Sequence, residues 1–311
     1  METNTRRTTP FNHGISGPDP TGIIAGSREK GEMALQRPLG EDSMETTPYE
    51  PIERYVRGRK MENGAYSSIL SDGIGVPSIK DTDWALRIFG SLHLPLADPD
   101  TTLDWLHKVS GEILEEGDIK SGYHLVRSSL ALGGILPDFS GFLSEAAKRL
   151  VPGDSSFFEE DGRLAQCHFW LWIEASGIGE SPEGQRRIRT FLEHRMPSLI
   201  REPSDLPSLG HALESLHLLG IGMERISQKQ WESFQDPATG FRLTPKSRMS
   251  TLETLWWGKA ISRRFRLPIF YPEAVQCFLD ECRTRKGGYG PRPGAVPDLE
   301  STGFALELLN A

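Results

Sequence analysis

Three carboxylates stand where the sequence pattern predicts that helices begin: Asp81, Glu253 and Glu300. A carboxylate in the first turn of a helix stabilises free backbone N–H groups and the positive end of the helix dipole, so each can be a structural cap. If their helices bring them together, they can also do chemistry, because carboxyl groups in a confined site have raised pKa values and can transfer protons. Two interpretations stay open: capping acids, or an acid–base cluster.

Aromatic residues are concentrated in the more apolar of the predicted helices. These residues are Trp84, Tyr123, His124, Phe169, Trp170, Trp172, Trp256, Trp257 and Phe304. Aromatic faces can stabilise a carbocation by cation–π attraction. An aromatic stripe at helical spacing is more often ordinary core, and the helical period predicts that about half of these side chains reach a shared interior.

Other polar candidates are fewer. Cys167 and His168 are adjacent, and adjacent residues on a helix point apart, so they are not expected to form a catalytic dyad. His211 begins another apolar helix, where a structural role and a substrate contact fit equally. Lys246 and Arg248 share one loop and could bind an anion.

Composition limits the function classes. The 311 residues, with 37% hydrophobic and 25% charged residues, are typical of a globular domain. The net charge of -8 argues against a nucleic-acid partner. There is no apolar run long enough for a membrane span, and the first residues lack the apolar core of a secretory signal. Three cysteines without a CxxC pair favour neither a disulfide framework nor a zinc knuckle. We therefore expect a cytoplasmic protein without a transmembrane segment.

The elements that must position these residues are paired helices. Residues 1–48 are rich in Thr, Gly, Pro and charge, which predicts a disordered or extended tail before a domain at residues 49–311. From Tyr49 an apolar helix and a more charged helix alternate with a period of about 40 to 50 residues, typical of helical-pair repeats. Six apolar helices are predicted, but only five of them are followed by a charged helix. The helix at residues 48–61 can supply the missing partner and close a ring.

Three copies of the repeat are clear in the sequence. The last reads GGYGPRPGAVPDLESTGFALELL, and the others begin at NGAYSS and TGFRLT. Ser78, Ser250 and Asp298 stand at the expected N-cap positions, and glycines supply the turns before them. The GGYG, PG and PDLEST-aromatic-AL pattern resembles the repeat of the terpenoid cyclase and protein prenyltransferase superfamily. The resemblance implies an all-α fold, an (α/α)6 toroid of about six inner and six outer helices.

The resemblance can be tested residue by residue against the prenyltransferase branch. The zinc ligands of those enzymes would fall on Glu253, Leu255 and Ser301, and of these only Glu253 can bind a metal, so zinc is not expected. The diphosphate-binding Arg and Lys of those enzymes would fall near Ser247 and Ser250, and the adjacent Lys246 and Arg248 could form an anion site in shifted form. A diphosphate substrate would bring Mg²⁺ with it.

Class II terpene cyclases instead protonate an alkene or epoxide with the middle aspartate of a DxDD motif. The most similar stretch is Asp298-Leu299-Glu300-Ser301, which keeps an acid pair and lacks the last aspartate. Lys80-Asp81-Thr82-Asp83 is a weaker match. Full-size cyclases carry two toroids, and this chain has room for one.

The resulting hypothesis is an isoprenoid-processing enzyme that binds a prenyl chain in an aromatic-lined cavity, with proton-initiated cyclisation preferred over prenyl transfer. Its expected catalytic residues are Asp298, Glu300, Asp81 and Glu253. Its expected substrate-binding residues are Trp84, Tyr123, His124, Trp170, His211, Lys246, Arg248, Trp256, Trp257 and Phe304. The alternative is a non-catalytic toroid that binds a lipid or a protein partner subunit. A carbohydrate-active barrel with two carboxylates across a cleft is not favoured by the PDLEST repeat.

Overall fold

The computed structural model describes residues 49–71, 74–151, 162–201, 204–222 and 226–310. The chain divides into two units at Glu45, and the fold described below is that of the second unit, Thr46–Ala311. The predicted tail at residues 1–48 lies outside the described residues.

The described part of the chain is mostly helical, with two short hairpins, which confirms the all-α class. Six helices are α2 (Ile79–Ser91), α4 (Ile119–Ala131), α6 (Gly162–Ala175), α8 (Leu206–Leu218), α10 (Leu252–Phe265) and α12 (Leu299–Asn310). The helices between them are α1 (Glu50–Arg57), α3 (Pro99–Glu116), α5 (Ser140–Leu150), α7 (Pro182–Arg201), α9 (Gln228–Ser233) and α11 (Pro272–Cys282). Two short hairpins complete the described elements, β1 (Leu70–Ser71) with β2 (Ile74–Gly75) and β3 (Gln235–Asp236) with β4 (Gly240–Phe241).

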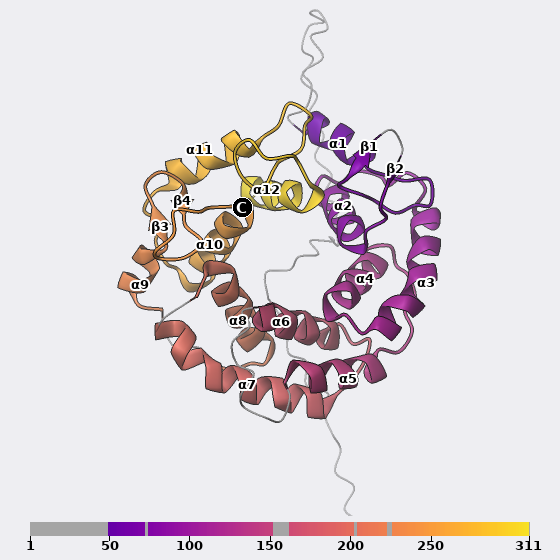
Figure 1. Ribbon diagram of the computed structural model, residues 1–311, viewed down its shortest axis with the longest axis horizontal. Coiled ribbons are helices and arrows are strands. Elements are labelled where there is room, and N and C mark those ends of the chain that lie inside the picture. The colour runs from indigo at the N-terminus through magenta and orange to yellow at the C-terminus, as the bar shows by residue number, and fades with distance from the viewer. Residues whose placement is uncertain (1–48, 72–73, 152–161, 202–203, 223–225, 311) are drawn as a thin grey trace, which may run out of the picture. The chain divides into compact units, whose positions relative to one another are not determined.

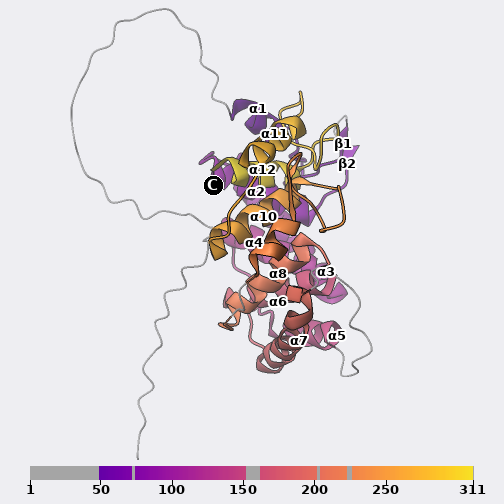
Figure 2. The same cartoon turned by 90° about the vertical axis from the view of Figure 1, so that its left-hand side faces the viewer.

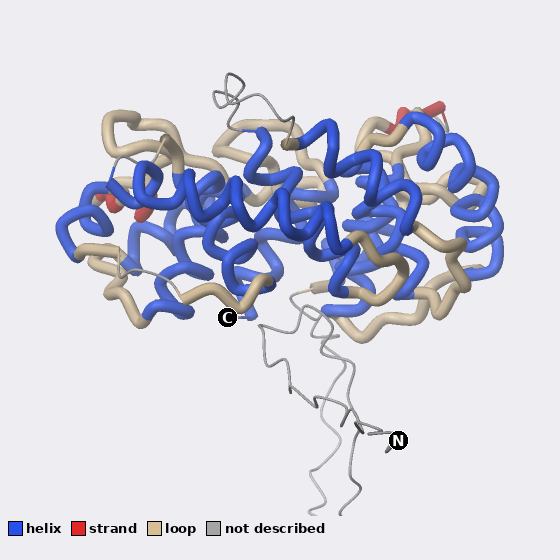
Figure 3. The backbone as a smooth tube through the Cα atoms, turned by 90° about the horizontal axis from the view of Figure 1, so that it is seen from below, coloured by secondary structure: helices blue, strands red, loops and turns tan. Residues whose placement is uncertain are grey.

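The six even-numbered helices form a closed series of neighbours. Each packs against the next in the order α2, α4, α6, α8, α10 and α12, and α12 packs against α2. Figure 1 shows these helices following one another around the middle of the picture, with the odd-numbered helices outside them. The loops lie along the two edges of the helical layers (Figure 3).

The helix starts follow the capping chemistry of the sequence. Ser78 caps α2 by accepting a hydrogen bond from the Asp81 backbone N–H at 3.1 Å, as predicted. Asp298 accepts a hydrogen bond from the Ser301 backbone N–H at 2.6 Å, also as predicted. The predicted cap Ser250 is one residue too early, because the Thr251 hydroxyl accepts from the Thr254 N–H and caps α10.

The first and last repeats share a detailed local structure. In the first, Tyr66 bridges Lys60 and Ser78, and its backbone N–H donates to the Thr82 hydroxyl at 3.0 Å. In the last, the same pattern joins Tyr289 to Arg283 and Asp298, and the Tyr289 N–H donates to the Thr302 hydroxyl at 3.0 Å. The repetition seen in the sequence is therefore also present in three dimensions.

The two ends of the described chain meet. The Tyr55 hydroxyl of α1 donates to the Pro297 carbonyl at 2.9 Å, across 242 positions of sequence. The Leu299 N–H donates to the Ser68 hydroxyl at 3.1 Å. These contacts join the loop before α2 to the first turn of α12, which brings together the carboxylates at the starts of the two helices.

Candidate functional site

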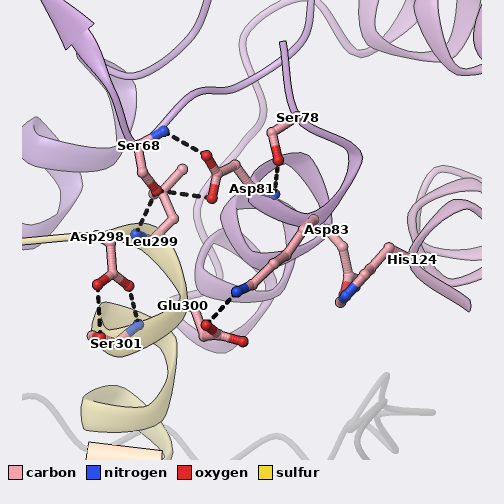
Figure 4. Close-up of polar contacts among 10 residues, drawn as sticks. Ser68, Ser78, Asp81, Asp83, His124, Asp298, Leu299, Glu300 and Ser301 are labelled. Atoms are coloured by element: carbon pink, nitrogen blue, oxygen red, sulfur yellow. Dashed lines mark hydrogen bonds and ion pairs between the residues drawn. The ribbon is translucent and has the colours of Figure 1, made fainter. Parts of the chain in front are cut away.

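The Asp81 carboxylate is fully engaged by Ser68 (Figure 4). One oxygen accepts from the Ser68 backbone N–H at 2.6 Å and the other from the Ser68 hydroxyl at 2.8 Å. The Ser68 hydroxyl in turn accepts from the Leu299 N–H. Asp81 therefore fixes the seam between α2 and α12, and both of its oxygens bond Ser68, whereas Ser78 caps α2.

Asp298 is a helix cap at the same end. Its carboxylate accepts from the backbone N–H of Ser301 at 2.6 Å and from the Ser301 hydroxyl at 2.9 Å. Burial raises the pKa of Asp298, against the lowering effect of these two hydrogen bonds. Both carboxylate oxygens accept hydrogen bonds from Ser301, so the Asp298 side chain caps the start of α12.

Glu300 forms an ion pair with Lys80, at 2.5 Å between Oε2 and Nζ. Burial lowers the pKa of Lys80, but the Glu300 charge and hydrogen bond outweigh it, so the net pKa is raised. Lys80 therefore stays charged at neutral pH. The pair links α2 and α12 a second time, close to the Asp81–Ser68 contact (Figure 4).

Glu253, in the first turn of α10, has a different environment. No hydrogen bond or ion pair to its carboxylate occurs within the described ranges. Burial and the negative charge of Glu300 raise its pKa to about 7, and the positive charges of Lys80 and Lys120 oppose this. Since a carboxyl group with such a pKa is half protonated at neutral pH, Glu253 can donate a proton.

The effect of the Lys120 charge on the pKa of Glu253 and of His211 indicates that the starts of several helices lie near one another. Lys120 begins α4, whereas Glu253 begins α10, and two helices separate α4 from α10 in either direction around the closed series. The Lys120 charge nevertheless lowers the pKa of Glu253 and also that of His211 on α8. The starts of α2, α4, α8, α10 and α12 are thus within electrostatic range of one another.

A buried ion group lies deeper along α2 and α4. His124 Nδ1 is 2.8 Å from Asp83 Oδ2, and Arg127 Nε is 3.6 Å from the other Asp83 oxygen (Figure 4 shows the first pair). Burial raises the pKa of Asp83, but Arg127 and His124 outweigh it and hold the pKa below its usual range. Asp83 is therefore an anion, and the His124 Nε2 atom is buried without a hydrogen-bond partner in the described part of the chain.

A second ion pair extends this group to α12. Arg87 pairs with Glu307, and the Trp256 indole N–H donates to the other Glu307 oxygen at 2.5 Å. The Arg87 guanidinium also lies 3.9 Å from the ring centre of Trp84. The sequence analysis did not predict four members of this group as site residues: Asp83, Arg87, Arg127 and Glu307. Of these, only Asp83 appeared in a motif, the stretch Lys80-Asp81-Thr82-Asp83.

Aromatic rings surround these charges. Tyr123 stacks on Phe169 with ring centres 4.5 Å apart, and Trp84 meets Phe304 at 4.7 Å. The series continues through contacts at 4.6 to 5.3 Å. We call these side chains the aromatic group: Trp84, Tyr123, Phe169, His211, Trp256, Trp257 and Phe304. The structure therefore brings together most of the predicted aromatic residues, from α2, α4, α6, α8, α10 and α12.

A histidine pair belongs to the same region. His168 Nδ1 lies 3.0 Å from His211 Nδ1, so one imidazole donates and the other accepts. Burial lowers the pKa of His168 to about 4 and that of His211 well below its usual value. Both rings are neutral at physiological pH. The sequence analysis expected no dyad of Cys167 and His168, and it did not identify His211 as the partner of His168, which is 43 positions away.

Three predicted substrate-binding residues lie elsewhere. Trp170 is fully buried, and its indole N–H donates to the Leu143 carbonyl of α5 at 2.8 Å. It therefore packs between the inner and outer helices, away from the aromatic group. Lys246 and Arg248 are exposed in the loop before α10. The helical period cannot distinguish the two buried sides of a helix that packs between other helices.

No group of three or more His, Cys, Asp or Glu residues within the described ranges is arranged to hold a metal ion. Among the same residues, no helix is both long and apolar enough to cross a membrane. No protein-family model matches the sequence, and no curated protein is detectably similar to it.

Proposed function

We propose that the chain is an (α/α)6 toroid that binds an isoprenoid against the aromatic group and starts its reaction by proton transfer from Glu253. The proposal rests on one observation: the Glu253 carboxyl has a pKa of about 7 and no described partner, whereas the other predicted acids are engaged. Both the fold type and the isoprenoid substrate come from the resemblance of the repeat, and the closed series of six helices supports the fold type alone.

Helix geometry favours contact between the acid and an apolar substrate. Trp256 and Trp257 follow Glu253 by three and four residues on α10, so they lie one turn further along the same side. A chain bound against Trp256, Trp257 and Phe304 would have one end near the Glu253 carboxyl.

The chemistry is a proton-initiated cyclisation. The O–H bond of the Glu253 carboxyl breaks and its proton adds to an alkene carbon or an epoxide oxygen, while the alkene π bond or an epoxide C–O bond breaks and leaves a carbocation on the substrate. Aromatic faces stabilise that cation until a double bond of the same chain attacks it. Loss of a proton from the cyclised cation completes the reaction, and the Glu253 carboxylate is reprotonated from solvent.

The test is direct incubation of the purified protein with geranyl, farnesyl and geranylgeranyl diphosphates and with squalene, with and without Mg²⁺, followed by mass spectrometry. A cyclic product that keeps its diphosphate is expected for proton-initiated chemistry. The Glu253→Gln variant should lose this product by about a hundredfold or more. Glu112→Gln, which changes an exposed carboxylate of α3, is the matched control and should retain it. Full turnover by Glu253→Gln would remove Glu253 from the mechanism.

The alternative, a non-catalytic toroid, is favoured by a different observation. Asp81, Asp298 and Glu300 all serve helix starts or an ion pair, as in a protein that has kept the fold and lost the reaction. Recovery of bound, unchanged lipid from the incubations would support this alternative. Diphosphate release that requires an added acceptor would instead indicate prenyl transfer.

A further inference from the structure

Positive charge is concentrated in two loops of this acidic chain. The segment at residues 237–252 contains Arg242, Lys246 and Arg248 and no acidic residue, although Arg242 pairs with Asp236 just before it. The segment at residues 283–297 contains four basic residues and no acidic one. These segments precede α10 and α12, and their charge opposes the net charge of -8 of the whole chain. A local excess of one sign in a chain of the other sign favours a partner surface of opposite charge.

The same loops expose aliphatic side chains. Met249 is 57% exposed and Val296 is 79% exposed. In the loop before α2, Ile69, Ile74 and Val76 are between 74% and 81% exposed. These aliphatic side chains have no role in the core, and Met249 and Val296 share their loops with basic residues.

Backbone contacts place the three loops side by side. The Leu252 N–H at the start of α10 donates to the Pro291 carbonyl at 3.0 Å. The Leu299 N–H at the start of α12 donates to the Ser68 hydroxyl, next to Ile69. The β1–β2 hairpin and the carboxyl end of α12 lie at opposite edges of the helical layers in both side views (Figure 2 and Figure 3). The loops therefore share the edge at which these inner helices begin.

We propose that this edge docks on an anionic lipid surface. The docking surface, which we call the basic loop face, consists of Ile69, Ile74, Val76, Lys246, Arg248, Met249, Arg292 and Val296. Its aliphatic side chains enter the region between headgroups and acyl chains, and its basic side chains pair with anionic headgroups. Exposed Lys246, Arg248 and Arg292 are available for this, since none forms an ion pair within the described ranges.

The observations favour a lipid surface over a nucleic acid or an acidic protein. Single-stranded nucleic acid is bound through exposed aromatic side chains on which bases stack, and the exposed large side chains of this face are aliphatic. Double-stranded nucleic acid is bound by a continuous basic stripe that follows the phosphate backbone, and Lys246, Arg248 and Arg292 do not form such a stripe. A stable protein interface contains a packed apolar centre, whereas these aliphatic residues stand on separate loops among prolines and glycines. Separate insertion points suit a fluid bilayer.

The experiment is co-sedimentation of the full chain with vesicles of phosphatidylcholine alone or of phosphatidylcholine with 30% phosphatidylserine. Binding to the anionic vesicles is expected, with a marked loss at high salt. The double variant Lys246→Gln/Arg248→Gln should weaken this binding by about thirtyfold. Met249→Ser/Val296→Ser should weaken it on anionic vesicles and remove any remaining binding at high salt.

The matched controls lie away from this edge. Ile135→Ser changes an aliphatic residue that is 87% exposed in the loop after α4, and Lys108→Gln changes an exposed lysine of α3. Both should bind anionic vesicles as the unaltered chain does. Equal loss in controls and face variants, no binding to anionic vesicles, or tighter binding to a polyanion such as heparin than to vesicles would each overturn the proposal. The assay needs no turnover, so its failure and that of the proposed catalysis are distinguishable.

Discussion

A carboxyl group can act as an acid only where it is protonated at neutral pH and not already used to hold the fold. Asp81, Asp298 and Glu300 each have close partners that fix the position of the carboxylate. Glu253 is the exception, because burial and the nearby Glu300 charge make ionisation unfavourable. Such an arrangement costs stability, and the cost can be measured.

The first prediction is a pH-dependent effect of Glu253→Gln. Burial raises the pKa of Glu253 from 4.5 to about 7. Between these values the folded chain binds more protons than the unfolded chain, so the stability of the unaltered protein falls as pH rises through this window and stays reduced above it. The variant should gain about 3 kcal/mol over the unaltered protein between about pH 4 and about pH 8. Urea unfolding at the two pH values measures this, and the same difference at both would contradict it.

The second prediction concerns the buried anion Asp83. Replacement by Asn leaves the Arg127 charge buried without its carboxylate and weakens the partner of His124. Breaking a buried ion pair from one side typically costs several kcal/mol, so we expect a loss of about 3 kcal/mol or more in the free energy of unfolding. Glu145→Gln, which breaks the exposed pair with Lys148, should cost less than about 1 kcal/mol. Similar small losses in both variants would show that Asp83 is not essential to the packing.

At the scale of the helices, two glycines allow the tryptophan ring of a neighbouring helix to lie directly against the helix backbone. A Cβ atom added at Gly303 of α12 would lie 2.3 Å from the Trp84 ring of α2, and one at Gly210 of α8 would lie 2.1 Å from the Trp257 ring of α10. The two tryptophans of the aromatic group are therefore held against the bare backbones of neighbouring helices. Alanine at either position would move a ring that the site depends on.

The third prediction compares a glycine that packs against a ring with a glycine that faces open space. Alanine has a higher helix propensity than glycine by about 1 kcal/mol, so Gly111→Ala in α3, where the added atom meets nothing within 4 Å, should stabilise the chain. Gly303→Ala should destabilise it by about 1 to 3 kcal/mol instead, because overpacking outweighs propensity. Thermal unfolding of the two variants gives the comparison. A gain in stability for Gly303→Ala would mean that Trp84 can move without cost.

Helices and their caps were the part of this structure that the sequence could predict. Ser78 and Asp298 were identified because local hydrogen-bond chemistry selects the residues at a helix start, and the same chemistry allowed either Ser250 or Thr251 at α10. The Asp83–His124 and His168–His211 contacts could not be predicted, since 41 and 43 positions separate their members. Such pairs depend on which helices become neighbours, and periodicity does not specify that.

At the scale of the whole unit, stability depends on closure. In an open helical array each repeat touches only its neighbours, so the last repeat can be lost while the others stay folded. In this chain α12 packs against both α10 and α2, and Leu299 and Pro297 beside it bond to Ser68 and Tyr55. Removal of α12 would therefore open two inter-helix contacts and expose the apolar sides of two other helices.

The last prediction follows from that arrangement. A chain that ends at residue 298 lacks only α12, a helix of 12 residues. We expect it to lose most of its helical circular dichroism signal and its cooperative urea transition, because the buried residues Trp84, Phe304 and Leu306 are part of one continuous core. Removal of the same length from a structure held by local contacts would lower the signal only in proportion to the helix removed. That proportional loss, with an intact transition, would show that closure contributes little to stability.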